Sequence, residues 1–147
     1  MNWNEVHPKV RELAKDRFNN GFYADAISNT LREINTIIKA EVLRISGTEY
    51  DGVDLMRQAF SFQYNNGNLI RNARILFVPD LTTESRRNIQ DGYMNIFVGT
   101  ISAIRNSKAH GNLNPNENKT RHLLQLSSLL FIKIEEAGLA IPETNKV

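Results

Sequence analysis

The sequence contains no cysteine among its 147 residues. This absence excludes disulfide frameworks, thiolate metal sites and cysteine nucleophiles. The sequence also lacks an uncharged apolar run long enough to cross a bilayer. Its first residues carry charges every few positions, which is not typical of a signal peptide. We therefore expect a cytoplasmic protein without a membrane partner.

Neither sign of charge dominates, since 18 Lys and Arg face 16 Asp and Glu for a net charge of +2. This balance does not by itself indicate nucleic-acid binding. The distribution is less even, because residues 1–56 carry seven basic and nine acidic side chains, whereas residues 57–147 carry eleven and seven. A basic second half favours contact with phosphates. A solvated surface of uneven charge explains the composition equally well.

Apolar residues recur at intervals of three and four, which is typical of amphipathic helices. The pattern predicts four long helices, one short helix and a long irregular connector with a brief extended piece at 75–78. The long helices are expected over residues 8–18, 23–45, 84–105 and 119–138, the short helix over 55–60 and the connector over 63–80. We predict an all-α bundle, with residues 1–147 forming one domain, a core over about 5–138 and a loose tail over 139–147.

The segment AIRNSKAHGN, residues 103–112, carries the most reactive group of side chains. Arg105 is a permanent cation suited to phosphate oxygens, and His110 can exchange protons near neutral pH. Asn106 lies four residues before His110, on the same helical face. Arg105 and His110 are five residues apart, roughly 140° around a regular helix, so they converge only where the helix ends or distorts. In a competing interpretation, Arg105 and Lys108 favour the negative helix end and His110 caps it.

Several motifs together resemble the Ymh-type branch of the HEPN superfamily. They are HPKVRELAKDRFNNGFYADAI, SGTEYDGVDLMRQAFS, GYMNIFVGTISAIRNSKAHGN and the closing leucine-rich helix, and the resemblance covers about residues 5–137. It implies a four-helix bundle that dimerises two-fold and an Arg-x(4–6)-His motif, here Arg105, Asn106 and His110. Many active HEPN proteins are metal-independent endoribonucleases of toxin–antitoxin, phage-defence or RNA-processing systems.

The resemblance implies RNA cleavage at a composite site formed across a homodimer. His110 from each protomer would serve as base and acid while the 2′-hydroxyl attacks the phosphate, and Arg105 would stabilise the transition state. Asn106 would orient His110 or hold a phosphate oxygen. No metal and no cofactor are expected. An antitoxin or other regulatory protein is an expected further partner.

Three basic residues near the motif are predicted to guide the RNA backbone: Lys108, Lys119 and Arg121. Two alternatives remain open: a non-catalytic HEPN-like dimeric module that binds a protein or RNA, and a ligand-binding bundle with a pocket between helices. The sequence also departs from its relatives, which often carry acidic residues in the middle of the second helix. Asn29 and Asn35 stand there, so the source of a carboxylate that would orient Arg105 or His110 is open.

Other polar and aromatic residues have plainer interpretations. His7 is expected to start a helix and His122 to face solvent, while the asparagines of NNGN form a turn. Four arginines line an RNA groove or, with somewhat better support, a solvated surface: Arg71, Arg74, Arg86 and Arg87. Five aromatic residues are expected in the core or a dimer interface rather than as platforms for bases: Trp3, Phe22, Tyr23, Phe97 and Phe131.

Overall fold

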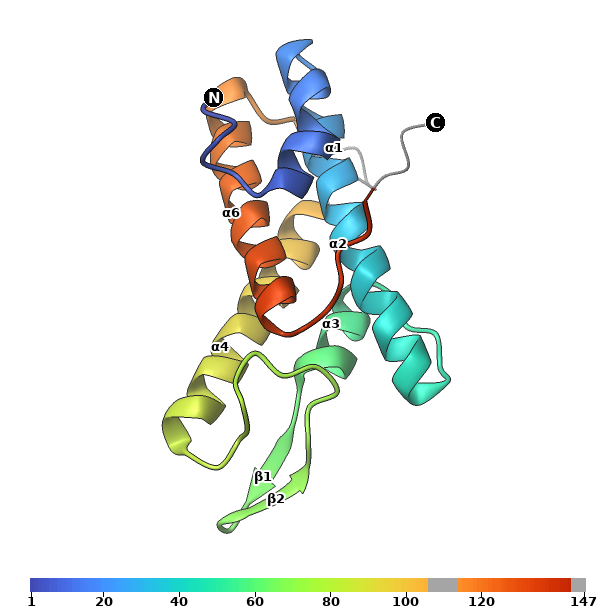
Figure 1. The fold of residues 1–147 in the computed structure, drawn as a ribbon, viewed down its shortest axis with the longest axis vertical. Coiled ribbons are helices and arrows are strands. Elements are labelled where there is room, and N and C mark those ends of the chain that lie inside the picture. The colour runs from blue at the N-terminus through green and yellow to red at the C-terminus, as the bar shows by residue number, and fades with distance from the viewer. Residues whose placement is uncertain (106–113, 144–147) are drawn as a thin grey trace. The chain divides into compact units, whose positions relative to one another are not determined.

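The computed structural model describes residues 1–105 and 114–143. These residues form five α-helices and one two-stranded hairpin (Figure 1). The helices are α1 (Pro8–Asn19), α2 (Tyr23–Ser46), α3 (Gly52–Phe60), α4 (Glu84–Thr100) and α6 (Glu117–Glu136). The hairpin consists of β1 (Gln63–Asn65) and β2 (Asn68–Arg71), and a π-helical turn, η1 (Ile101–Arg105), follows α4. The four long helices and the short one are thus confirmed. None of the described helices is long and apolar enough to span a membrane.

The chain divides into two compact units, each with its own buried residues. Unit 1 comprises Met1–Ile34 and Ile104–Val147, and unit 2 comprises Asn35–Ala103. Helix α2 contributes its first half to unit 1 and its second half to unit 2. The expectation of one domain over residues 1–147 stays a prediction.

In unit 1, His7 starts helix α1, as the sequence predicts. Its Nδ1 accepts a hydrogen bond from the Lys9 backbone N–H at 3.1 Å, which caps the helix. Its own backbone N–H donates to Ser128 Oγ at 2.7 Å, and its ring stacks on Phe131 with 5.3 Å between centroids. Nε2 lies 3.1 Å from a carboxylate oxygen of Glu135. These contacts fasten the start of α1 to α6 and give both ring nitrogens a structural role.

The core of unit 1 is apolar, with an aromatic group at the α1–α2 turn. Phe18 contacts Trp3 and Tyr23 edge to face, with centroids 5.5 and 5.3 Å apart. Gly21 allows the chain to reverse there because its φ of 79° is one that other residues rarely adopt. The remaining buried apolar side chains are Val6, Val10, Ala14, Ala26, Ile27, Leu31, Ile34, Ile104, Leu124, Leu130, Phe131 and Ile134.

The first part of the predicted tail is not loose. Residues 139–143 have no regular structure, but the Pro142 carbonyl accepts a hydrogen bond from Lys9 Nζ at 2.7 Å. Lys9 is buried, and its ammonium also lies 3.2 Å from Glu12. A buried ammonium needs such partners, so the chain after α6 is held against the start of α1.

In unit 2, a buried amide on α2 holds the start of α3. Asn35 Nδ2 donates to Asp51 Oδ1 at 2.8 Å, and its Oδ1 accepts from the Gly52 N–H at 3.2 Å. The Asp51 side chain, at the N-cap position, makes no capping hydrogen bond of its own. Asn35 therefore satisfies one of the N–H groups that a helix start leaves open.

A second buried amide joins α4 to the irregular connector. Gln90 is fully buried; its Oε1 accepts from the Phe77 N–H at 2.8 Å, and its Nε2 donates to the carbonyls of Phe60 and Ile75 at 3.0 and 2.9 Å. Phe60, Phe77 and Phe97 surround this amide with centroids 4.5 to 5.4 Å apart. One side chain thus satisfies three backbone groups that have no helix or sheet partner.

The hairpin corrects the sequence-based expectation of an irregular connector. Asn66 and Gly67, with φ of 49° and 79°, form the turn, as a two-residue Asn-Gly hairpin loop requires. The strand pairs are Asn65 with Asn68, Tyr64 with Leu69 and Gln63 with Arg71. Residues 75–78, expected to be extended, contain bends and no strand, because their backbone groups bond to Gln90 and Ala59 instead.

We predict that Gln90→Leu lowers the free energy of unfolding by about 2–4 kcal/mol, because three buried backbone groups lose their partner. Urea denaturation followed by circular dichroism measures this change. Gln125→Leu on the exposed face of α6 is the matched control and should change stability little. Equal stability of the two variants would contradict this role of Gln90.

Candidate functional site

Arg105 lies at the end of η1, where the regular helix has already changed. Helix α4 begins at the Thr83 cap, whose hydroxyl accepts from the Arg86 N–H at 3.2 Å, and ends at Thr100. The Thr100 hydroxyl donates to the Ile96 carbonyl at 2.7 Å. A hydroxyl that shares the carbonyl four residues earlier weakens and bends a helix. The π-helical turn follows directly.

The η1 turn alternates in burial. Ile101 and Ile104 are buried, Ser102 and Ala103 are exposed, and Arg105 is half-buried. The sequence required a helix that ends or distorts for Arg105 and His110 to converge, and a distortion is present just before the motif. Three predicted site residues, Asn106, Lys108 and His110, lie outside the described residues.

Helix α6 supplies the two other predicted RNA contacts, and these side chains differ in their surroundings. The helix begins at Glu117, two residues earlier than expected, because Asn116 Oδ1 accepts from the Lys119 N–H at 2.8 Å and caps it. The Lys119 side chain is exposed. Arg121 is half-buried; it pairs with Glu117, and its guanidinium lies 5.5 Å from the centroid of the Phe18 ring. Arg105, Lys119 and Arg121 all belong to unit 1.

The ion pair on α6 sets the charge of its first turn. The hydrogen bond and charge of Arg121 lower the pKa of Glu117 below its usual 4.5. Glu117 is therefore ionised at neutral pH and offsets much of the charge of Arg121. Of the two basic residues, Lys119 is the better placed to contact a phosphate, and Arg121 also braces α6 against Phe18.

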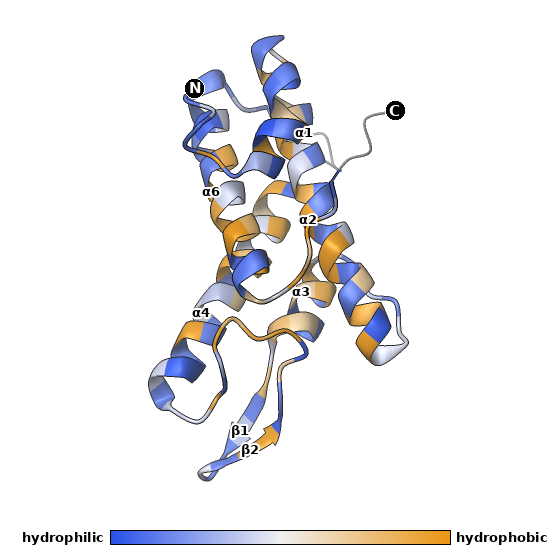
Figure 2. Ribbon diagram, viewed as in Figure 1, coloured by the Kyte–Doolittle hydropathy of each residue, from blue (hydrophilic) through white to orange (hydrophobic). Residues whose placement is uncertain are grey.

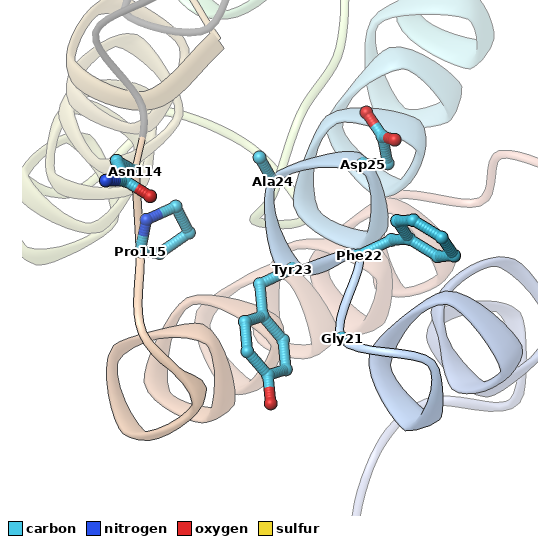
Figure 3. Close-up of a pocket in the computed structure, with 7 residues that line it drawn as sticks. All are labelled: Gly21, Phe22, Tyr23, Ala24, Asp25, Asn114 and Pro115. Atoms are coloured by element: carbon cyan, nitrogen blue, oxygen red, sulfur yellow. The ribbon is translucent and has the colours of Figure 1, made fainter.

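A small cavity of about 230 Å³ lies beside the start of α2. Figure 3 shows Asn114 and Pro115 on one side of it and Tyr23 and Ala24 on the other. Asn114 is the first described residue after the motif. Its volume is below the roughly 300–1,000 Å³ of typical small-molecule sites. The cavity therefore gives little support to a ligand-binding bundle.

Asn29 and Asn35, the two asparagines in the middle of α2, have structural partners. Asn29, with its amide oriented by its hydrogen bonds, accepts from Arg17 Nε at 2.6 Å. Asn35 holds the start of α3 as described above. Both positions therefore stabilise the fold.

The four arginines predicted to line an RNA groove or a solvated surface all make hydrogen bonds or ion pairs in unit 2. Arg71, Arg74 and Arg87 donate to the backbone carbonyls of Ser61, Gln58 and Leu81 at 3.0, 2.9 and 2.9 Å, and Arg86 pairs with Asp80 at 2.6 Å. The hydrogen bonds from Thr82, together with Arg86, lower the pKa of Asp80 to about 2. The sequence shows only that these residues are basic. It does not identify the carbonyl and carboxylate groups that they contact.

The core expectation is confirmed for Phe97 and Phe131, and the histidine expectations for His7 and His122. Phe97 and Phe131 are fully buried, whereas Phe22 is 60% exposed beside the cavity. His122 is exposed on α6, as expected, and His7 is buried. In the described residues, no group of three His, Asp or Glu side chains is arranged to hold a metal ion.

Comparison with known proteins gives one match. A family model described as "Protein of unknown function (Hypoth_ymh)" matches residues 4–134. No curated protein and no solved structure matches the chain. The matched region contains α1 to α4 entirely, the whole motif segment and nearly all of α6.

We predict that Arg121→Ala raises the pKa of Glu117 toward 4.5, because the side chain that lowers it is removed. In the wild type, a carboxylate with a depressed pKa stabilises the folded state above its unfolded pKa, and this stabilisation is lost as the pH falls through the lower folded value. A pH titration of the Glu117 carboxyl carbon by NMR measures the shift. Lys119→Ala is the control and should leave this pKa in place; an unchanged pKa in Arg121→Ala would contradict the ion pair.

Proposed function

The chain belongs to the Hypoth_Ymh family, and we propose that it is a metal-independent endoribonuclease of the HEPN type. Its proposed site is the motif Arg105-Asn106-x3-His110, completed by the same motif of a second copy. Such an enzyme suits a toxin–antitoxin or phage-defence system, in which a partner protein restrains it. The observation that carries the proposal is the loss of regular helical geometry over Ile101–Arg105, directly before the rest of the motif.

The π-helical turn follows the regular α-helix and ends at the residue where the motif begins. In a regular α-helix, residues five apart point roughly 140° away from each other, which separates an arginine from a histidine. A π-helical turn hydrogen-bonds residue i to residue i+5 and contains more residues than an α-turn. Such turns frequently occur at functional sites. Arg105 stands at the end of this turn, half-buried beside buried Ile104.

The residues suit cleavage that uses the RNA's own 2′-hydroxyl as nucleophile. One His110 takes the 2′-hydroxyl proton as the 2′-oxygen bonds to phosphorus. The other His110 gives a proton to the 5′-oxygen as the bond from phosphorus to that oxygen breaks. The products are a 2′,3′-cyclic phosphate and a 5′-hydroxyl. Arg105 stabilises the extra negative charge on the phosphoryl oxygens, and Asn106 orients His110 or holds one of those oxygens.

A homodimer is part of the proposal, because one chain supplies one such histidine and the chemistry needs a base and an acid. A two-fold axis through the motif brings two copies of each residue into one cleft. Helix α4, which leads to the motif, supports this arrangement. Its Ile89 and Ile96 are 42% and 38% exposed, and a Cβ added at Gly92 or Gly99 would meet nothing within 4 Å. This open, partly apolar face suits close packing against a second α4.

Around the cleft, Lys108 and Lys119 are the proposed guides for the RNA backbone, and Arg121 contributes less because Glu117 offsets its charge. Phosphate contacts of this kind make affinity fall as salt rises. They position the strand without selecting a sequence.

We predict that Arg105→Ala and His110→Ala each reduce cleavage of mixed cellular RNA in EDTA by roughly 10²–10⁴-fold, as loss of a positioned proton-transfer group or charge does. The assay compares the variants with wild type at matched dimer content and identifies the ends by their 2′,3′-cyclic phosphate. His122→Ala, on the exposed face of α6, is the control histidine and should cleave like wild type.

Two results would contradict the proposed enzyme. Cleavage that survives His110→Ala at equal dimer content would remove the base and acid from the mechanism. Activity that requires Mg²⁺, or that disappears on further purification, would point to a contaminating nuclease and leave the chain a non-catalytic module that binds a protein or RNA.

A further inference from the structure

The β1–β2 hairpin is an exposed element with little part in the core of unit 2. All three residues of β1 and all four of β2 are exposed. Figure 1 shows the hairpin extending away from α3 and α4, and Figure 2 shows an apolar stretch on β2 within a mostly hydrophilic ribbon. A two-stranded hairpin by itself is marginally stable in water. Exposed apolar residues on such an element indicate a surface with a role other than packing.

Charge is distributed unevenly around this hairpin. Residues 55–79, which contain it, include three arginines and no aspartate or glutamate. The rest of unit 2, residues 35–54 and 80–103, carries four basic and seven acidic side chains. Residues 55–79 are thus the positive segment of an otherwise acidic unit.

One face of the hairpin carries a partly exposed aromatic ring, and a cation lies over one side of that ring. The Arg87 guanidinium carbon lies 3.7 Å from the centroid of the Tyr64 ring, and Arg87 is itself held by the Leu81 carbonyl. Tyr64 is 38% exposed and pairs with Leu69, 43% exposed, so these two side chains share a face of the ribbon. With Arg87 over one face of the ring, the exposed remainder is a surface for another flat group.

The register gives β2 a further exposed apolar side chain and an arginine. Gln63 pairs with Arg71 and Tyr64 with Leu69, so Ile70 is the extra residue of a bulge, and it is 60% exposed. The Arg71 guanidinium donates to the carbonyl and hydroxyl of Ser61 at 3.0 and 3.1 Å, which fixes this cation at the end of β2.

We propose that the β1–β2 hairpin is a docking surface for single-stranded RNA, on which an unpaired base stacks against Tyr64 and a neighbouring base contacts Leu69 and Ile70. Arg71 then meets the phosphates between them, and the exposed amides of Asn65 and Asn68 meet base edges. Stacking on an exposed aromatic ring next to a cation is how proteins hold single strands with little sequence preference. This proposal rests on the proposed function, in that RNA is taken as the substrate.

Two other occupants fit these observations less well. A protein strand that adds to a sheet edge needs a regular edge, whereas β1 and β2 are three and four residues long and carry a bulge, features that prevent such pairing. Double-stranded RNA keeps its bases stacked inside the helix, out of reach of Tyr64. Only an unpaired strand offers both base faces and phosphates to this surface.

The test measures binding separately from cleavage. Fluorescence anisotropy follows the binding of labelled oligouridine and oligoadenosine to the full chain in EDTA, with every protein carrying His110→Ala. The added double substitution Tyr64→Ser/Ile70→Ser should raise Kd about tenfold or more, as loss of a stacked base does. The control is Leu43→Ser/Ile45→Ser, which removes side chains 45% and 43% exposed in the same unit and should leave Kd unchanged. Circular dichroism checks that both double variants are folded.

An unchanged Kd in the hairpin variant, or no binding of either oligonucleotide by the parent, would overturn the proposal. A hairpin variant that binds RNA normally but changes its sedimentation coefficient would identify the hairpin as a protein contact instead. The outcomes for the two proposals are separable. Weaker binding by the hairpin variant together with no cleavage by wild type supports the RNA surface and contradicts the nuclease. Cleavage that depends on Arg105 and His110, together with RNA binding that is independent of the hairpin, supports the nuclease and contradicts the RNA surface.

Discussion

The Gln90 side-chain amide is the interaction on which unit 2 depends most. The chain between the hairpin and α4 forms no helix and no strand, yet Ile75 and Phe77 are buried within it. Burying backbone N–H and C=O groups outside helices and strands lowers the free energy of unfolding unless these groups make hydrogen bonds. Gln90 supplies a partner to that segment and to the end of α3 at once. Gln90 therefore joins both the end of α3 and the connector to α4.

Helix α4 links this constraint to the proposed chemistry. Gln90 and Phe97 fix its inner face in the core of unit 2, and the helix then changes to a π-helical turn that ends at Arg105. Because the core fixes the rotation of α4, the direction in which η1 begins is also determined. The proposed nuclease thus depends on the change of helical geometry that follows α4.

Unit 1 shows how side chains that resemble site residues serve the fold instead. His7 has both ring nitrogens engaged, by the Lys9 N–H and by Glu135, as the cap of α1. Arg121, expected to guide RNA, divides its guanidinium between Glu117 and the Phe18 ring. Lys119 remains as an exposed cation on the first turn of α6. In the sequence, these three side chains gave the same kind of evidence, namely residue type and spacing. Only the groups that surround each side chain in the structure distinguish a structural role from an exposed cation.

The sequence by itself determined the helices, because apolar residues at a period near 3.6 define one buried face whatever that face packs against. It also determined the start of α1 at His7-Pro8 and the Asn66-Gly67 turn, since these depend on a residue and its immediate neighbours. The strands beside that turn were missed because every residue in them is exposed, so no alternation marks them. Tertiary structure alone decided the roles of Asn35 and Gln90, the pairing of Arg87 with Tyr64 and the π-helical turn before Arg105. Each of these depends on a partner distant in the sequence or on packing around a helix, and a polar side chain in the sequence does not reveal which buried group it will meet.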